Sequence, residues 1–355
     1  MWPRTRLLDL LQIDHPIIQA PMAGNATPAL AIAVSNAGGL GGLGCSFMSA
    51  AELRATAAEL RAGSNRSFNL NFFAHPEPKE DAAIIASTRT LLRPFYEELG
   101  LAEVPDQGLA PCNTFGAAAL DVLLDIRPKA VSFHFGLPPI EMVRALQDAG
   151  IVILCSATTV AEARLLAAAG VDAVIAQGWE AGGHRGTFHV SADDFGVGTM
   201  ALVPQIVDAV TVPVIAAGGI GDGRGIAAAF ALGASGVQMG TAFLSCPEAN
   251  ISEAERTALR NARDDETGLT KAFSGRPARA KTNRYIETMA KQHARLPDFP
   301  AMYAFSSPLI EAATAKGNEE FQFILYGQSA ALNRERPAAE LLTMLVDEAQ
   351  RILNP

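Results

Sequence analysis

The stretch from residue 213 to 225 reads PVIAAGGIGDGRG, and residues 236–241 read GVQMGT. Each begins with a short apolar run typical of a buried strand and continues into glycine. Glycines after a strand let backbone N–H groups approach a phosphate, and the N-terminus of a following helix favours negative charge. A single glycine pair could equally serve a tight turn. Two such loops after consecutive strands favour a phosphate site.

The same alternation of strand and helix extends back to about residue 15. Short apolar or β-branched runs alternate with Ala- and Leu-rich segments, which is typical of parallel strands joined by helical crossovers. Eight strands are predicted, at residues 16–21, 40–43, 68–72, 130–135, 151–155, 173–176, 212–217 and 236–239. An open doubly wound sheet more often has roughly five or six strands. The sequence therefore predicts an α/β fold, a (β/α)8 TIM barrel.

The helices between these strands carry start signals. Thr27-Pro28 places a capping residue before proline, and Ser49…Glu52 and Thr159…Glu162 have capping-box spacing. The alternation is therefore supported by local sequence signals as well as by composition.

The strand-helix alternation stops after the eighth predicted strand. We assign residues 1–246 and 336–355 to the barrel and 247–335 to a smaller, mostly helical cap. A closing amphipathic helix is predicted at about residues 338–353, and the long connection after the third strand is predicted to add a helix at about 82–99.

Composition excludes several classes of protein. The 355 residues include 28 Lys and Arg against 37 Asp and Glu, a net charge of -9, without a clustered basic stretch, so nucleic acid is not an expected partner. No run of ~20 apolar residues predicts a membrane span. Cys45, Cys112, Cys155 and Cys246 lack C-x-x-C spacing and disulfide-framework density, so a soluble protein of the reducing cytoplasm is expected.

A second glycine run, residues 39–44, reads GLGGLG and formally matches the G-x-G-x-x-G dinucleotide fingerprint. It follows a helix-like stretch rather than a strand, and no suitably placed acid marks a ribose contact. We interpret it as a helix end that leads into a barrel strand.

Polar and glycine residues follow the predicted strands at the points where these end. Because the carboxyl ends of barrel strands meet at one face, these residues should converge on a single site. They are the APMAG stretch at 20–24, Asn71, His134, Ser156, Gln177, Gly218-Gly219 and Gly240-Thr241.

His184 is the leading catalytic candidate. It lies in the loop AQGWEAGGHRGT at residues 176–187, where flanking glycines can place an imidazole over a cofactor, and imidazole suits proton transfer near neutral pH. The alternative is that His184 is a surface-loop histidine with no functional role. His134 ends the fourth strand and points either into the packed barrel or onto its rim, and the residues alone leave both open. No metal-ligand spacing and no G-x-S-x-G elbow are found, so neither a metal site nor a simple hydrolase is predicted.

Four strings together resemble the nitronate monooxygenases, formerly called 2-nitropropane dioxygenases, and specifically class I. They are PIIQAPMAG at 16–24, VSFHFG at 131–136, QGWEAGGHRG at 177–186 and PVIAAGG at 213–219. The resemblance covers most of residues 13–285. The GGHRG and SFHFG strings are quite specific, whereas the glycine loops occur in many flavin and phosphate barrels.

The resemblance implies FMN as cofactor. The residues implied to bind it are Ala20, Pro21, Met22, Asn71, Gln177, Gly182, Gly218, Gly219, Gln238, Met239, Gly240 and Thr241. His184 is implied as the catalytic histidine, and His134, which would line the pocket and help to hold the negative charge of the nitronate, as the second catalytic residue.

The resemblance also implies a reaction. A nitronate such as propionate 3-nitronate, or a nitroalkane, would give one electron to FMN, and O2 would convert the resulting radical to a carbonyl compound and nitrite through a flavin semiquinone. Class I members usually carry a tyrosine- and lysine-bearing stretch in the cap. Here residues 298–307 retain Tyr303 as the substrate-binding candidate but offer no obvious lysine. This departure from the class I pattern bears on the identity of the substrate more than on the cofactor.

Other readings remain at this point. An FMN barrel that takes hydride from NAD(P)H, acting on quinones or enoyl thioesters, would keep the phosphate loops. A sugar-phosphate isomerase or aldolase would need a strand-end lysine or paired carboxylates, which are not found at the predicted rim. If the chain were a non-enzymatic binding protein, the histidine loop would have no assigned role, so this alternative is less favoured. Monomer and homodimer are both open.

Overall fold

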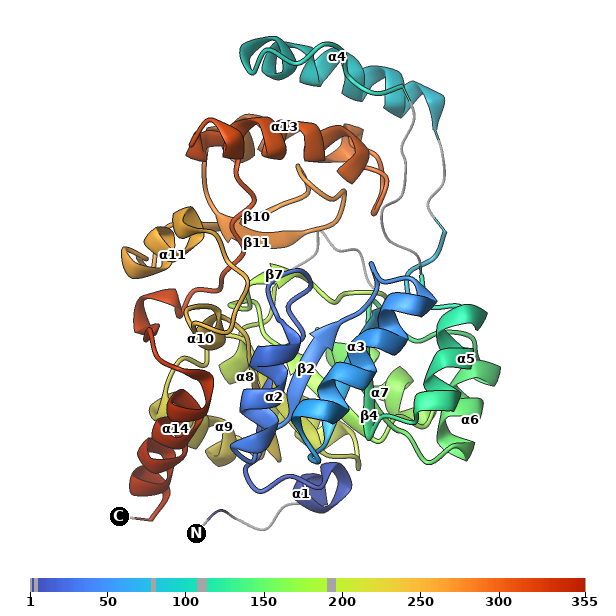
Figure 1. Cartoon of the computed structure of the whole chain (residues 1–355), viewed down its shortest axis with the longest axis vertical. Coiled ribbons are helices and arrows are strands. Elements are labelled where there is room, and N and C mark those ends of the chain that lie inside the picture. Colours follow the sequence, from blue (N-terminus) through green and yellow to red (C-terminus); the bar gives the residue numbers. More distant parts are fainter. Residues whose placement is uncertain (1, 3–5, 78–80, 107–113, 190–195, 355) are drawn as a thin grey trace.

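The computed structural model of the chain describes all residues apart from 1, 3–5, 78–80, 107–113, 190–195 and 355. Its centre is a sheet of eight parallel strands surrounded by helices (Figure 1). The strands are β1 (Ile17–Gln19), β2 (Gly41–Gly44), β3 (Phe68–Phe73), β4 (Ala130–His134), β5 (Val152–Ala157), β6 (Ala173–Gln177), β8 (Val214–Ala217) and β9 (Gly236–Met239). Each overlaps one of the predicted strands.

The strands lie in the order β1-β9-β8-β6-β5-β4-β3-β2. A parallel bridge between Ile18 and Leu40 joins the first and last strands, so the sheet closes on itself. The predicted (β/α)8 barrel is confirmed.

Helices follow the strands on the outside of the barrel. They are α2 (Pro28–Asn36), α3 (Ala50–Gly63), α5 (Ala117–Ile126), α6 (Ile140–Asp148), α7 (Val160–Ala168), α8 (Thr199–Ala209) and α9 (Gly223–Ala231). At the start of α3 both halves of the predicted capping box form, because Ser49 accepts from the N–H of Glu52 and the Glu52 carboxylate accepts from the N–H of Ser49.

The box predicted for α7 forms only in part. Thr159 accepts from the N–H of Glu162, but the Glu162 carboxylate accepts instead from Thr158 and from the backbone N–H groups of Phe188 and His189. This fully buried carboxylate therefore ties the helix to the segment that follows the histidine loop. The capping-box spacing predicted the start of the helix correctly, but it could not predict this contact between distant residues.

The N-terminal end of the barrel is closed by α1 (Arg6–Leu11), which lies opposite the cap (Figure 1). Leu7 and Leu11 are fully buried and pack in one cluster with interior residues of the barrel such as Ile175 and Ile215. The last helix, α14 (Ala338–Leu353), packs against α2 and α9, at the predicted place. Only the opposite end of the barrel is left for a ligand site.

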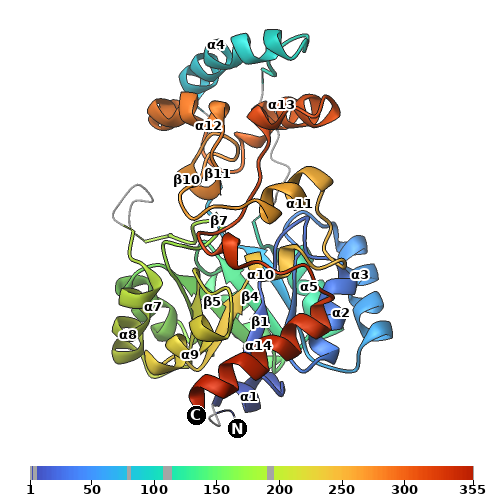
Figure 2. The same ribbon diagram turned by 90° about the vertical axis from the view of Figure 1, so that its left-hand side faces the viewer.

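A cap lies over that opposite end (Figure 2). It contains α4 (Ala82–Glu98), α11 (Glu253–Arg260), α12 (Arg284–Met289), α13 (Tyr303–Ala315), the short 3-10 helices η1 (Ala290–Arg295) and η2 (Glu319–Phe321), and the strands β10 (Thr267–Thr270) and β11 (Ala278–Lys281). One apolar cluster joins residues of α4 to α12 and α13, so the helix predicted at 82–99 packs with the cap. A further 3-10 helix, η3 (Ala330–Leu332), and the short α10 (Thr241–Leu244) lie near the boundary with the barrel.

The cap also has a sheet that the sequence analysis does not anticipate. β10 pairs antiparallel with β11, and β11 pairs antiparallel with β7 (Gly183–His184), which comes from the loop after β6. The histidine predicted to lie in a flexible glycine loop is therefore on a strand.

Three cysteines, Cys45, Cys155 and Cys246, are buried free thiols, and Cys112 lies outside the described residues. Burial raises the pKa of the Cys45 thiol to about 12. Within the described part of the chain, no helix has both the length and the apolar character required to cross a bilayer.

Candidate active site

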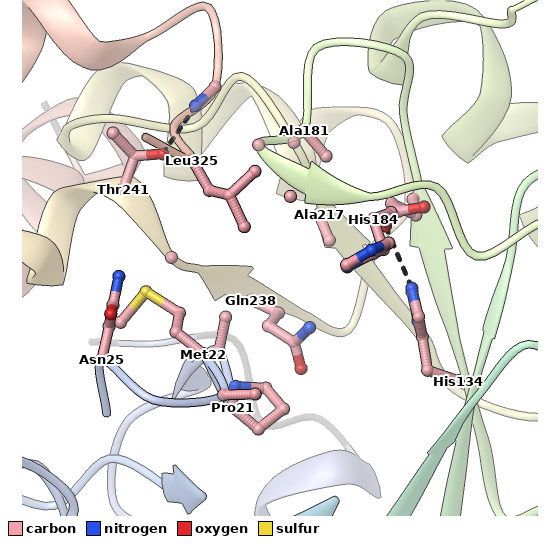
Figure 3. Close-up of a pocket in the computed structure, with 18 of the residues that line it drawn as sticks. Pro21, Met22, Asn25, His134, Ala181, His184, Ala217, Gln238, Thr241 and Leu325 are labelled. Atoms are coloured by element: carbon pink, nitrogen blue, oxygen red, sulfur yellow. Dashed lines mark hydrogen bonds between the residues drawn. The ribbon is translucent and has the colours of Figure 1, made fainter. Parts of the chain in front are cut away.

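A cavity of about 390 Å³ lies between the C-terminal ends of the barrel strands and the cap (Figure 3). This volume is within the range of small-molecule sites. The catalytic candidates His134 and His184, the substrate-binding candidate Tyr303 and all the FMN-binding candidates line it. Of the residues predicted at the strand ends, Gly24 does not line the cavity. The convergence predicted from the strand ends is present in the structure, whereas the roles of the individual residues stay predictions.

One end of the cavity is formed by the two glycine loops. Gly218 and Gly219 have φ values of 103° and 72°, a left-handed conformation that favours glycine. Thr241, in the second loop, begins α10, and its hydroxyl accepts from the N–H of Gly327 at 2.9 Å. The loop around Gly327 thus closes this end from the cap side.

Gln238, in β9, points into the middle of the cavity (Figure 3). Its Oε1 atom is buried without a hydrogen-bond partner among the described residues. An unpartnered buried amide oxygen costs about 1–3 kcal/mol, so this atom suits a ligand that brings an N–H group.

The backbone of His184 is fixed by two side chains from the barrel strands β4 and β6. Its carbonyl oxygen accepts from Nε2 of His134 and from Nε2 of Gln177, both at 3.0 Å. The other end of the Gln177 amide accepts from the N–H of Gly186 at 2.7 Å. Together with the pairing of β7 and β11, these bonds hold His184 at the cavity wall.

Both ring nitrogens of His134 are used in this arrangement. A carbonyl can only accept, so Nε2 of His134 carries the proton that it donates to His184. Nδ1 is therefore the acceptor, and it lies 2.9 Å from Oγ of Ser156, whose hydroxyl donates to it. His134 is on the rim, as one of the two sequence-based alternatives expected, but its ring nitrogens face protein partners.

Both histidines are neutral near pH 7. Burial, with smaller contributions from His134 and Arg276, lowers the pKa of His184 to about 3. Burial, with the nearby charges of Arg276 and Arg185, lowers the pKa of His134 to about 4. The Arg276 guanidinium lies 3.9 Å from the ring centroid of Phe135 and donates to the carbonyl of Thr187. The partly buried Arg276 thus places a positive charge near both histidines.

Aromatic rings surround the imidazole of His184. Ring-centroid distances to it are 6.2 Å for Phe73, 5.9 Å for Phe135, 5.5 Å for Phe299, 6.5 Å for Tyr303 and 6.3 Å for Phe323. We call these five residues the aromatic wall. These rings shield part of the imidazole from water, and this desolvation is the main cause of its lowered pKa.

Sequence reasoning identified only Tyr303 in the aromatic wall. Phe73 and Phe135 directly follow or end predicted strands, so their position could have marked them. Phe299 and Phe323 lie in cap segments without a strand-helix pattern, and no local signal places them near His184.

Charged side chains are nearly absent from the cavity lining. Among the described residues that line it, Glu255 is the one ionisable carboxylate, and none is Lys or Arg. The cap lysine expected from the resemblance has no counterpart in this lining. Nor do the described residues contain a cluster of His, Cys, Asp or Glu that could hold a metal ion.

Comparisons with known proteins show the family of the chain. The nitronate monooxygenase family model matches residues 4–348. The chain is similar to a nitronate monooxygenase of Pseudomonas aeruginosa, with 49% identity over 97% of this chain and 98% of the relative. It is also similar to a nitronate monooxygenase of Paraburkholderia phytofirmans, with 46% identity over 97% and 95% of the two chains.

Solved structures show the same fold. Nitroalkane oxidase from Streptomyces ansochromogenes superposes with a TM-score of 0.89 at 38% identity, covering 97% of this chain and 98% of that chain. FabK from Thermotoga maritima gives a TM-score of 0.76 at 31% identity, covering 99% and 98%. The protein is therefore an oxidoreductase, and by sequence and fold its chain belongs to the nitronate monooxygenase family.

Proposed function

We propose that the protein oxidises alkyl nitronates with O2 to a carbonyl compound and nitrite, with FMN as its cofactor. The observation that carries this proposal is that the glycine loops of β8 and β9 and the imidazole of His184 line one cavity of about 390 Å³. A phosphate-bearing ligand held at the loops can extend under the imidazole.

The residues present fit FMN. Gly218, Gly219 and Thr241 would hold the phosphate, because glycine backbone allows N–H groups to approach an anion closely. The unpartnered Oε1 of Gln238 would accept from the N–H of the flavin ring system. When bound, FMN supplies the one-electron redox chemistry, and the protein supplies orientation, exclusion of water and proton transfer.

His184 is the proposed catalytic residue. A neutral nitroalkane must first lose a proton from carbon, and a neutral imidazole is ready to accept it. A nitronate arrives without that proton, and its negative charge would raise the pKa of the adjacent imidazole and favour the protonated, charge-pairing form. Arg276 adds positive charge behind the ring.

His134 and Gln177 are proposed to position His184. Both donate to its carbonyl oxygen and neither ring nitrogen of His134 is left for a substrate. His134, which the sequence analysis named as catalytic, therefore acts in this proposal through the backbone of His184. Tyr303 is proposed to contact the substrate from the cap.

The proposal is tested with the purified protein loaded with FMN. Addition of a nitronate without oxygen should change the flavin absorption to that of the one-electron-reduced form, and admission of air should release nitrite. Rapid bleaching by NADH combined with no nitrite in air would instead establish the reductase alternative. A protein that does not take up FMN would remove the flavin from the proposal.

A further inference from the structure

We infer that Ser274, a cap residue, fixes the tautomer of His184, so that Nε2 carries the proton and Nδ1 is the atom that receives a proton from substrate. This inference rests on the proposed function of His184 as a base. Ser274 is 1% exposed and does not line the cavity, so it would act through His184 as a positioning residue.

The other hydrogen bonds of the Ser274 hydroxyl determine which group donates in its bond to His184. Its Oγ lies 2.9 Å from Nε2 of His184, 3.1 Å from the carbonyl oxygen of Arg276 and 3.3 Å from the N–H of Arg276. A hydroxyl has one hydrogen and two lone pairs. The carbonyl can only accept, so the hydroxyl hydrogen goes to Arg276, and both lone pairs are free to accept.

One lone pair accepts from the Arg276 N–H, and the other faces His184. If Nε2 of His184 carries the proton, every group in this buried cluster is satisfied. If Nε2 were bare, it and the Arg276 carbonyl would compete for a single hydrogen, and one buried acceptor would remain unpaired. The cluster therefore selects the form with a proton on Nε2.

The second ring nitrogen is left with its lone pair. Nδ1 of His184 makes no hydrogen bond to any residue in the described part of the chain, while the ring itself projects into the cavity (Figure 3). The reaction balances simply. The carbon–hydrogen bond of a nitroalkane breaks, its proton goes to Nδ1, and the electron pair stays on the substrate as the nitronate.

The histidine backbone is fixed independently of the ring. His134 and Gln177 hold the carbonyl of His184, and β11 pairs with β7 in the register Ala278 to His184. Loss of the Ser274 hydroxyl should therefore affect the state of the ring more than the position of the chain. This separation makes the inference testable.

The test compares Ser274→Ala with Ser274→Thr, which keeps a hydroxyl, using protein loaded with FMN and labelled with 15N-histidine. In the parent protein the His184 nitrogen shifts should report a protonated Nε2 and a bare Nδ1, assigned by their loss in His184→Asn. Ser274→Ala should shift them towards an average of the two tautomers, and Ser274→Thr should restore the parent pattern.

Kinetics provides the second readout. In Ser274→Ala, kcat/KM for a neutral nitroalkane should fall about 10- to 100-fold, because that substrate needs the base. The value for the corresponding preformed nitronate should fall much less, and Ser274→Thr should recover the nitroalkane activity. A purely structural role for Ser274 predicts equal losses with both substrates.

The inference is overturned if the parent protein has its His184 proton on Nδ1, or if Ser274→Ala keeps both the parent nitrogen shifts and the parent nitroalkane rate. The nitrogen shifts do not depend on turnover. If neither substrate is oxidised by the parent protein, the proposed function fails while the tautomer is still measured.

Discussion

At the scale of single residues, the site depends on one imidazole held from three sides. His134 and Gln177 fix its backbone, and Ser274 contacts its ring. We expect His184→Asn to lower nitroalkane oxidation by roughly 10²–10⁴-fold, the usual contribution of a general base. Oxidation of a preformed nitronate should fall less, as steady-state nitrite release would show.

The matched control for this substitution is His189→Asn, at an exposed histidine five positions along the same segment. It should retain parent activity with both substrates. Equal FMN content in both variants, read from their absorption spectra, would confirm that cofactor binding is intact. Unchanged nitroalkane oxidation in His184→Asn would contradict the role of the imidazole.

The buried neutral histidines also predict a pH dependence of stability. His134 has its pKa lowered from 6.5 to about 4 in the folded protein, mainly by burial. Between these values the unfolded chain binds a proton that the folded chain does not, so stability falls as pH drops below 6.5 and levels off near 4. One such group contributes at most about 1.4 kcal/mol per pH unit.

Urea unfolding of the parent and of His134→Asn at about pH 7 and about pH 5 measures this effect. The free energy of unfolding should fall less on acidification in His134→Asn, because that variant lacks the titrating group. Parallel losses in the two proteins would show that His134 titrates normally in the folded state.

At the scale of elements, β7 is packed against the segment that follows η2. A Cβ at Gly182 would lie 2.4 Å from the backbone N of Gly327, whereas a Cβ at Gly183 would have open space around it. Gly183 has φ of 75°, so Gly183→Ala should cost only the strain of a left-handed residue, about 1–2 kcal/mol.

Gly182→Ala should lower the free energy of unfolding by more than Gly183→Ala, because two backbones must separate. Urea unfolding of both variants without FMN gives the comparison. Equal losses in the free energy of unfolding would mean that the segment around Gly327 can move away at little energetic cost. The difference should also appear as weaker FMN retention in Gly182→Ala, since Gly327 adjoins Thr241.

The elements also show how far the sequence can predict this protein. The barrel strands were predictable because each is a local apolar run followed by a turn signal, and their polar ends meet by topology alone. β7 has two residues, and β11 reads ARAK, so neither carries a strand pattern. Their pairing arises from contacts about 95 positions apart in the sequence, between His184 and Ala278. No local rule could have predicted it.

The same limit applies to the site. Glycine and amide residues at strand ends could be assigned to the cavity before any coordinates. The contact of Ser274 with His184 and the position of Phe323 depend on how the cap folds over the barrel. The sequence alone predicted proton transfer at His184. The hydrogen-bond partners of this residue could be identified only from the structure.

At the scale of the whole molecule, the cavity lies between a polar surface, its floor, and an apolar surface, its roof. The floor comes from the barrel loops, and the roof from Phe73, Tyr303, Phe323, Leu325 and the half-exposed Phe47. A substrate tail that reaches past His184 meets aromatic rings. Burial of each additional CH2 there is worth about 0.8 kcal/mol, roughly fourfold in affinity.

We therefore expect the protein to prefer apolar tails to charged ones. The nitronate of 3-methyl-1-nitrobutane has nearly the shape of propionate 3-nitronate, with two methyl groups in place of the carboxylate oxygens. Its kcat/KM should be at least about tenfold higher, because a carboxylate loses its hydration without gaining a cation. A preference for propionate 3-nitronate would show that a cation outside the described lining reaches the substrate.

The hydrogen bonding of β7 has one more consequence. By sequence the strand belongs to the barrel, since it follows β6, but by pairing it belongs to the cap sheet. A displacement of the cap would therefore either break the pairing of β11 with β7 or pull His184 against the bonds that His134 and Gln177 make to its carbonyl oxygen. The imidazole is thus tied to both parts of the molecule, and its position depends on how the cap is seated on the barrel.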